Sequence, residues 1–135
     1  MKKYTGSCLC NAVQYEVSNL DYKMGHCHCS MCRKFHGAAF ATLGEAPVAD
    51  FKWTKGETDI KSYQAENGTV RKFCNQCGSS LIFVPSNDTG EVVEFSLGTL
   101  DTPISERPDV HIFVDSKADW YEVEDSLPQC KTGRK

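Results

Sequence analysis

The sequence predicts a mainly β fold in a single domain of 135 residues. Three observations support this prediction: short stretches in which apolar and polar residues alternate, turn residues between those stretches, and only weak helix signals. The length suits one hydrophobic core, so we expect one domain over residues 1–135, with its core from about residue 4 to about residue 125.

The first predicted strand is AVQYEV, residues 12–17. Successive side chains of a strand point to opposite faces, so Val13, Tyr15 and Val17 share one face and are expected in the core. Stretches of similar character predict further strands at residues 49–54, 59–65, 69–73, 80–84, 91–98 and 110–115.

Turn and helix signals lie between and after these strands. The sequence SNDTG, residues 86–90, separates two predicted strands, so we expect an antiparallel hairpin in which Gly90 takes a positive φ. Ser30 is expected to cap a short helical turn through residues 31–35. Residues 117–124 are predicted to form a second short helix or a further strand.

Charge and hydropathy exclude two kinds of partner. A net charge of −3 leaves no excess of Lys and Arg to displace counterions from phosphates, so we expect no nucleic-acid partner. Two N-terminal lysines are not followed by an apolar stretch, and no segment approaches the length of a membrane span. We therefore expect a soluble, cytoplasmic protein, while the oligomeric state is not indicated. In a reducing cytoplasm, eight cysteines are expected to be metal ligands or catalysts rather than disulfides.

Four of the cysteines form two closely spaced pairs. Cys8 and Cys10 make C-x-C, and Cys74 and Cys77 make C-x-x-C, followed by Gly78, which suits a tight turn. Such pairs can converge on one tetrahedral ion, so we predict a structural zinc that joins the N-terminal strand to the middle of the chain. Iron at the same four thiolates, buried apolar cysteines and a redox C-x-x-C pair are the alternatives.

A third group, Cys27, Cys29 and Cys32, has no fourth cysteine. Structural zinc is normally closed by four protein ligands, whereas three ligands and an open position are typical of a catalytic site. We therefore predict a second, catalytic zinc. Three thiolates make it a weak Lewis acid, so activation of a substrate thiol suits it better than activation of water.

The four histidines have several interpretations. His28 lies between two predicted ligands and is expected beside the metal without binding it, or in solvent. Either His26 or His36 as a fourth ligand would turn the open site into a closed one. His111 alternates with apolar residues in a predicted strand, where it is either a hydrogen-bonded core histidine or part of a pocket wall.

Two cations and the last cysteine complete the candidate residues. Arg33 and Lys34 follow Cys32 and are candidates for binding substrate carboxylates, with a solvated pair of charges as the alternative. Cys130 lies in LPQCKTGRK, which is predicted to be an exposed tail.

Five segments together resemble the glutathione-dependent formaldehyde-activating enzyme family: GSCLCNAVQYEV, HCHCSMCRKFHGAAF, RKFCNQCGSSL, LGTLDTP and HIFVDSKADW. The resemblance runs from about Gly6 to Trp120 and implies a small β-tent, with short antiparallel sheets joined around a structural zinc. It implies the structural zinc at the two cysteine pairs and the catalytic zinc at the group of three. Asn11 replaces the glycine usual after the first pair, but Asn tolerates the same left-handed backbone.

The resemblance also implies a reaction. We expect a zinc-dependent enzyme similar to a carbon–sulfur lyase, which activates glutathione or a similar thiol for addition to formaldehyde or another small aldehyde. The alternative is a zinc-stabilised β scaffold that binds a protein or a thiol adduct without turnover. An exchangeable fourth ligand on the second zinc would favour the enzyme, and a protein ligand would favour the scaffold.

Overall fold

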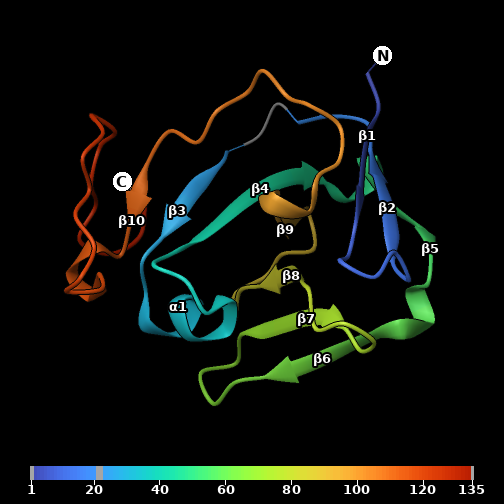
Figure 1. Cartoon of the computed structure of the whole chain (residues 1–135), viewed down its shortest axis with the longest axis horizontal. Helices are drawn as coiled ribbons and strands as arrows, with labels where there is room; N and C mark the ends of the chain where they lie inside the picture. The colour runs from blue at the N-terminus through green and yellow to red at the C-terminus, as the bar shows by residue number, and fades with distance from the viewer. Residues whose placement is uncertain (1, 21–22, 135) are drawn as a thin grey trace.

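The computed structural model describes residues 2–20 and 23–134, whose strands form two sheets (Figure 1). The smaller sheet has three antiparallel strands in the order β1-β2-β5: β1 (Tyr4–Ser7), β2 (Gln14–Val17) and β5 (Phe51–Lys55). It brings the N-terminal hairpin beside a strand from the middle of the chain.

The larger sheet has seven strands in the order β10-β3-β4-β9-β8-β7-β6. These are β3 (Gly25–Cys27), β4 (Ala41–Pro47), β6 (Ile60–Gln64), β7 (Val70–Cys74), β8 (Ser80–Val84), β9 (Val92–Ser96) and β10 (His111–Ile112). All neighbours are antiparallel except β3 and β10, which are parallel. The helix α1 (Ser30–His36) connects β3 to β4. The described residues also form four short 3₁₀ helices: η1 (Val48–Asp50), η2 (Glu57–Asp59), η3 (Leu97–Thr99) and η4 (Val114–Ser116).

The prediction of a mainly β fold is confirmed, and each of the seven predicted strands overlaps an observed one. The strands β1, β3 and β4 were not predicted, because none shows a clear alternation of apolar and polar residues. The parallel pair β3–β10 also departs from the expected purely antiparallel sheets, since β10 is reached by the long connection after β9 rather than by a hairpin.

Tyr15 is at the centre of the core between the sheets. Its ring stacks on Phe51 with centroids 5.0 Å apart and meets Phe95 at 5.7 Å, and its hydroxyl is 2.7 Å from Thr99 Oγ1. Gly6 is required here because a Cβ would lie 2.2 Å from the Tyr15 ring. The predicted inward face of residues 12–17 is confirmed, since its apolar side chains are all buried.

Local predictions had mixed outcomes. The β8–β9 hairpin is antiparallel and Gly90 has φ 77°, as expected. The prediction of a helix or strand over residues 117–124 was wrong, because this segment has neither pattern of backbone hydrogen bonds. The predicted tail does expose most of its side chains, but its backbone runs beside β10, with His111 N bonded to Pro128 O and Cys130 N to His111 O (Figure 1).

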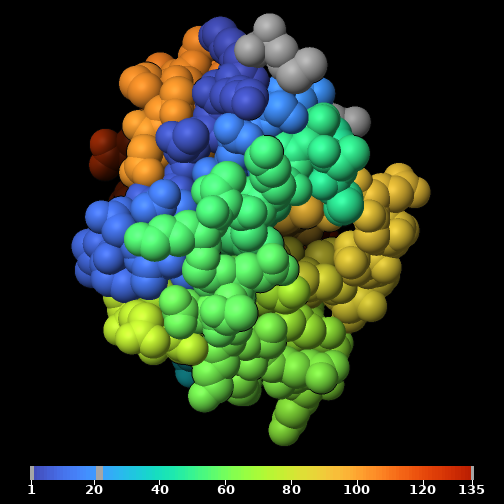
Figure 2. Space-filling view, turned by 90° about the vertical axis from the view of Figure 1, so that its right-hand side faces the viewer, coloured from blue at the N-terminus to red at the C-terminus, as the bar shows by residue number. Residues whose placement is uncertain are grey.

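A cavity of about 180 Å³ lies between the sheets, beside the gold segment that projects in Figure 2. Phe51, Trp53 and Phe83 give it apolar walls, and Glu94 lines it as well. Burial, followed by the nearby carboxylates of Glu45 and Asp88, raises the pKa of Glu94 to about 7. Among the described residues, no helix combines the length and apolar character needed to cross a membrane.

Candidate metal centres

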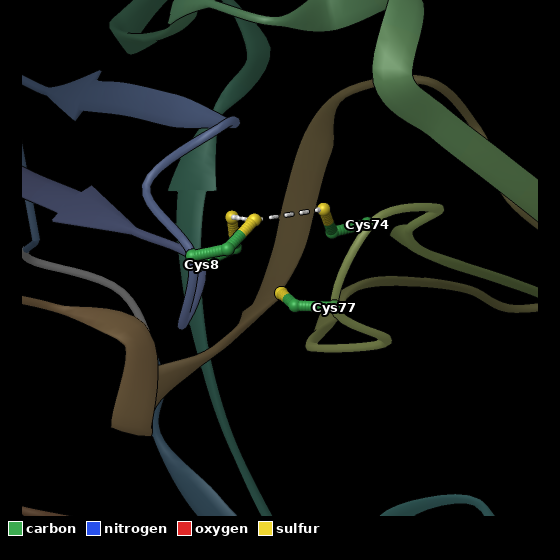
Figure 3. Close-up of side chains that lie close together, drawn as sticks. Cys8, Cys74 and Cys77 are labelled. Carbon is green, nitrogen blue, oxygen red and sulfur yellow. Dashed lines mark hydrogen bonds between the residues drawn. The ribbon is translucent and has the colours of Figure 1, made fainter.

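The first centre contains the four cysteines that form two closely spaced pairs in the sequence. Cys8 and Cys10 lie after β1, while Cys74 ends β7 and Cys77 lies in the next turn; all four sulfur atoms are within 4.8 Å of one another. The Cys8 and Cys10 sulfurs are 3.7 Å apart, and the Cys10 and Cys74 sulfurs are 3.8 Å apart. A zinc ion bound tetrahedrally at 2.3 Å places its sulfur ligands about 3.8 Å apart. The spacing of the four sulfurs therefore fits zinc. Figure 3 shows this centre, with Cys8, Cys74 and Cys77 labelled.

Backbone geometry holds these sulfurs in place. Asn11 has φ 67°, the left-handed backbone expected there, and Gly78 has φ 81° in the turn after the second pair. Backbone N–H groups donate to sulfur within each pair: Val13 N lies 3.3 Å from Cys8 Sγ, and Gln76 N lies 3.3 Å from Cys74 Sγ. Such donors stabilise negative charge on sulfur, which is the form that binds a metal.

The second centre is Cys27 at the end of β3, Cys29 before α1 and Cys32 in its first turn. Their sulfurs lie within 4.8 Å of one another, and no histidine nitrogen among the described residues belongs to the group. The backbone N–H of Cys32 donates to Cys29 Sγ over 3.2 Å. Cys29 rather than Ser30 therefore caps the helix, a correction that places a sulfur atom where a helix start favours negative charge.

The three thiols of the second centre strongly influence one another. The hydrogen bond with Cys27, followed by that with Cys32, lowers the pKa of Cys29 to about 2. Hydrogen bonds with Cys29 and then Cys32, followed by burial, raise the pKa of Cys27. One thiol thus ionises readily while its neighbour keeps a proton, and a cation bound among them would favour loss of that proton as well. This donor set suits zinc.

A chain of hydrogen bonds lies beside the second centre. His28 is fully buried, and its Nε2 is 2.8 Å from His111 Nδ1; His111 Nε2 is 3.0 Å from Asp125 Oδ2. Burial is the main cause that lowers the pKa of His28 to about 4, followed by nearby positive groups, so its ring is neutral near pH 7. His28 is thus beside the cysteines and out of solvent, and His111 is the hydrogen-bonded core histidine that the sequence suggested.

The other two histidines have partners of their own. His26 Nδ1 is 2.8 Å from Thr42 Oγ1, and His36 Nε2 is 3.4 Å from Ser80 Oγ. Neither belongs to the cysteine group, so the structure gives no support to a histidine as its fourth ligand. Burial lowers the pKa of both rings.

The cations predicted to bind substrate lie on α1. Arg33 Nε donates to Ser116 O over 3.2 Å, and Lys34 is exposed. A cavity of about 430 Å³ lies between this helix and the turn of the first centre, lined by Phe35, His36, Ser79 and Ser80 among others. Its hydroxyl and imidazole groups suit the amides and carboxylates of a peptide-like ligand.

Sequence reasoning missed one residue that contacts the second centre and one that contacts the neighbouring His111. Asp125 reaches His111 from the C-terminal segment, and Arg71 of β7 donates to Cys32 Sγ. In the sequence, Arg71 lies shortly before Cys74 of the first centre. Its sequence neighbours do not indicate that its side chain faces the second centre. Asp125 has no signal in the sequence at all, because its contact depends on the path of an irregular segment.

Comparisons with known proteins identify a family and relatives of this chain. The model of the family described as glutathione-dependent formaldehyde-activating enzyme matches residues 3–116. A protein of Halomonas elongata, provisionally named a glutathione-dependent formaldehyde-activating enzyme, is 34% identical over 127 residues, which cover 88% of this chain and 80% of that protein. An uncharacterized lyase of Schizosaccharomyces pombe is 27% identical over 126 residues, covering 90% of this chain and 86% of the relative.

A solved structure shares the fold. The crystal structure of a Rhodobacter sphaeroides protein superposes with a TM-score of 0.62 at 23% identity, covering 93% of this chain and 98% of that one. At this identity the similarity concerns the fold alone.

Proposed function

Since the chain belongs to the glutathione-dependent formaldehyde-activating enzyme family, we propose that it joins a small thiol, glutathione first of all, to formaldehyde. The observation that carries the proposal is the second centre: three cysteine sulfurs within 4.8 Å of one another, with no fourth protein donor among the described residues. Three protein ligands leave a position for a substrate atom, whereas four close the shell.

The two centres have different roles in this proposal. Cys8, Cys10, Cys74 and Cys77 hold a structural zinc, and Cys27, Cys29 and Cys32 hold a catalytic one. A zinc ion at the second centre would supply positive charge that keeps a substrate thiol ionised near neutral pH. A cytoplasmic location accords with eight cysteines that are all free thiols in the structure.

The side chains around the second centre bind and orient the substrates. Arg33 and Lys34 pair with the carboxylates of glutathione, and the polar cavity beside α1 accepts its peptide portion. Positioning both reactants converts an addition between two free molecules into a reaction within one complex. The new bond joins sulfur to the aldehyde carbon, the carbon–oxygen double bond becomes a single bond, and the oxygen takes a proton from water or a neighbouring histidine. The reverse reaction is that of a carbon–sulfur lyase, which accords with the name of the S. pombe relative.

The test is the rate at which glutathione and formaldehyde exchange with their adduct. This addition proceeds without a catalyst, so the barrier that remains to be lowered is small and the background must be subtracted. Two-dimensional exchange NMR at equilibrium measures both directions. We expect the zinc-loaded protein to increase the exchange rate in proportion to its concentration, and Cys29→Ser to abolish the increase. An exchange rate equal to the background would instead favour the scaffold without turnover.

A further inference from the structure

The side chain of Arg71 is a buried cation. Only 4% of its surface is exposed, and among the described residues it forms no ion pair with Asp or Glu. Placing a charge inside a protein is costly unless another group compensates for it. The compensating group must therefore be found among the neighbours of Arg71.

Those neighbours are a sulfur atom and two aromatic rings. Both terminal nitrogens of Arg71 lie 3.7 Å from Cys32 Sγ. The guanidinium carbon is 4.8 Å from the ring centroid of Phe83 and 5.6 Å from that of Phe35, and aromatic faces attract cations. The rings confine the guanidinium, and both of its terminal amino groups contact the same sulfur.

We propose that Arg71 is the counter-ion of the second centre, setting how tightly that centre binds its metal and how readily it accepts an anionic fourth ligand. Three thiolates and one divalent ion leave a single net negative charge, which the guanidinium neutralises. A substrate thiolate adds a second negative charge, whose repulsion Arg71 reduces. This role in thiolate acceptance rests on the proposed function, whereas the role in metal binding does not.

The two N–H groups also affect the sulfur itself. A hydrogen bond to a thiolate withdraws electron density from it, and groups outside the ligand set typically change metal affinity 10–100-fold when they are removed. No such cation contacts the four sulfurs of the first centre in any hydrogen bond or ion pair among the described residues. Arg71 therefore distinguishes the two centres.

The experiment uses Co²⁺, whose charge-transfer absorption reports its sulfur ligands, in the full-length protein. Arg71→Met removes the charge and the donors. Arg71→Lys keeps the charge but replaces the paired guanidinium N–H groups by a single ammonium group. Lys72→Met is the matched control. Lys72 follows Arg71 in β7 and lines the cavity between the sheets. Competition with a chelator gives the affinity of each centre.

We expect Arg71→Met to lose about 10–100-fold in affinity for Co²⁺ at the second centre alone, with the charge-transfer band at lower energy. Arg71→Lys should lose less, and Lys72→Met should match the wild type. Wild-type affinity and band position in folded Arg71→Met would show that the residue only packs between rings and would overturn the proposal. If that variant does not fold, Arg71→Lys provides the test. Unchanged Co²⁺ affinity and band position in Arg71→Lys would refute the proposal that the guanidinium N–H groups set the metal affinity of the second centre.

A titration of the Co²⁺ proteins with glutathione separates this inference from the proposed function. A glutathione-induced band in the wild type that is weakened in Arg71→Lys supports the role in accepting an anionic ligand. If glutathione leaves the wild-type spectrum unchanged while Arg71→Met still loses metal affinity, the proposed function fails and the role of Arg71 in metal binding stands.

Discussion

The two cysteine centres use the same ligand atom for different structural purposes. In the first centre, Cys10 and Cys74 are 64 residues apart, and the four sulfurs connect the end of β1 to the turn after β7. In the second, all three sulfurs come from residues 27–32, around the start of one helix. A metal at the first centre thus closes a long loop, and a metal at the second orders a short one. We therefore expect the span between ligands, rather than their chemistry, to decide which centre supports the fold.

The largest expected effect follows from breaking the first centre. Cys77→Ser removes one of four ligands from a metal that joins distant strands, and such binding contributes about 10 to 16 kcal/mol to folding in small zinc domains. We expect the variant to be unfolded or aggregated. Circular dichroism and gel filtration of the purified protein measure this, and a folded variant that retains its metal would contradict the role of the first centre.

Breaking the second centre should have a smaller effect on the fold. Cys29→Ser removes a metal ligand, but leaves an N-cap for α1 and the connection between the sheets intact. Because serine is itself a favoured N-cap residue, we expect a folded protein that has lost one metal ion and little stability. Thermal melts and metal analysis check this; destabilisation as severe as that of Cys77→Ser would make both centres structural.

Substrate binding is expected to depend on the cations of α1, beside the second centre. Arg33→Ala should weaken glutathione binding by about 1.5–3 kcal/mol, the contribution of a hydrogen bond to a charged group. The metal content should not change. Calorimetry provides the measurement, with Lys55→Ala on the smaller sheet as the control. Equal affinity for glutathione in Arg33→Ala and wild type would show that Arg33 does not bind the substrate.

A further expected effect belongs to neither centre: the stability of the protein should change with pH through Glu94. Because the pKa of Glu94 is raised from 4.5 to about 7, the folded state keeps a proton that the unfolded chain has released. Its contribution to stability is complete below about pH 4.5 and is lost as pH rises toward 7. Glu94→Gln should therefore gain roughly 1–2 kcal/mol over wild type at pH 8, after allowance for partial exposure, and nothing near pH 4.5.

Denaturant unfolding of Glu94→Gln at the two pH values measures this gain. The exposed Glu91, replaced by Gln, is the matched control. A gain that is the same at both pH values would attribute the effect to packing rather than to ionisation.

The sequence predicted what depends on local spacing and missed what depends on tertiary contact. The partition of seven cysteines followed from short intervals, because a tight turn brings both sulfurs of a pair to one side. The strand β3 was missed because its three residues, GHC, have too few apolar side chains to show a period. Arg71 reaches Cys32 from β7 and Asp125 reaches His111 from the C-terminal segment, so neither had a signal in its own neighbourhood.

The central claim is that one centre supports the fold and the other is dispensable for it. Stepwise metal removal from the wild-type protein tests this most directly, with zinc content and circular dichroism followed in the same sample. We predict two zinc ions per chain, of which a mild chelator removes one without change in the spectrum, while a strong chelator removes the other and unfolds the protein. A single zinc ion that draws ligands from both cysteine groups, or unfolding on loss of the first ion, would contradict the account.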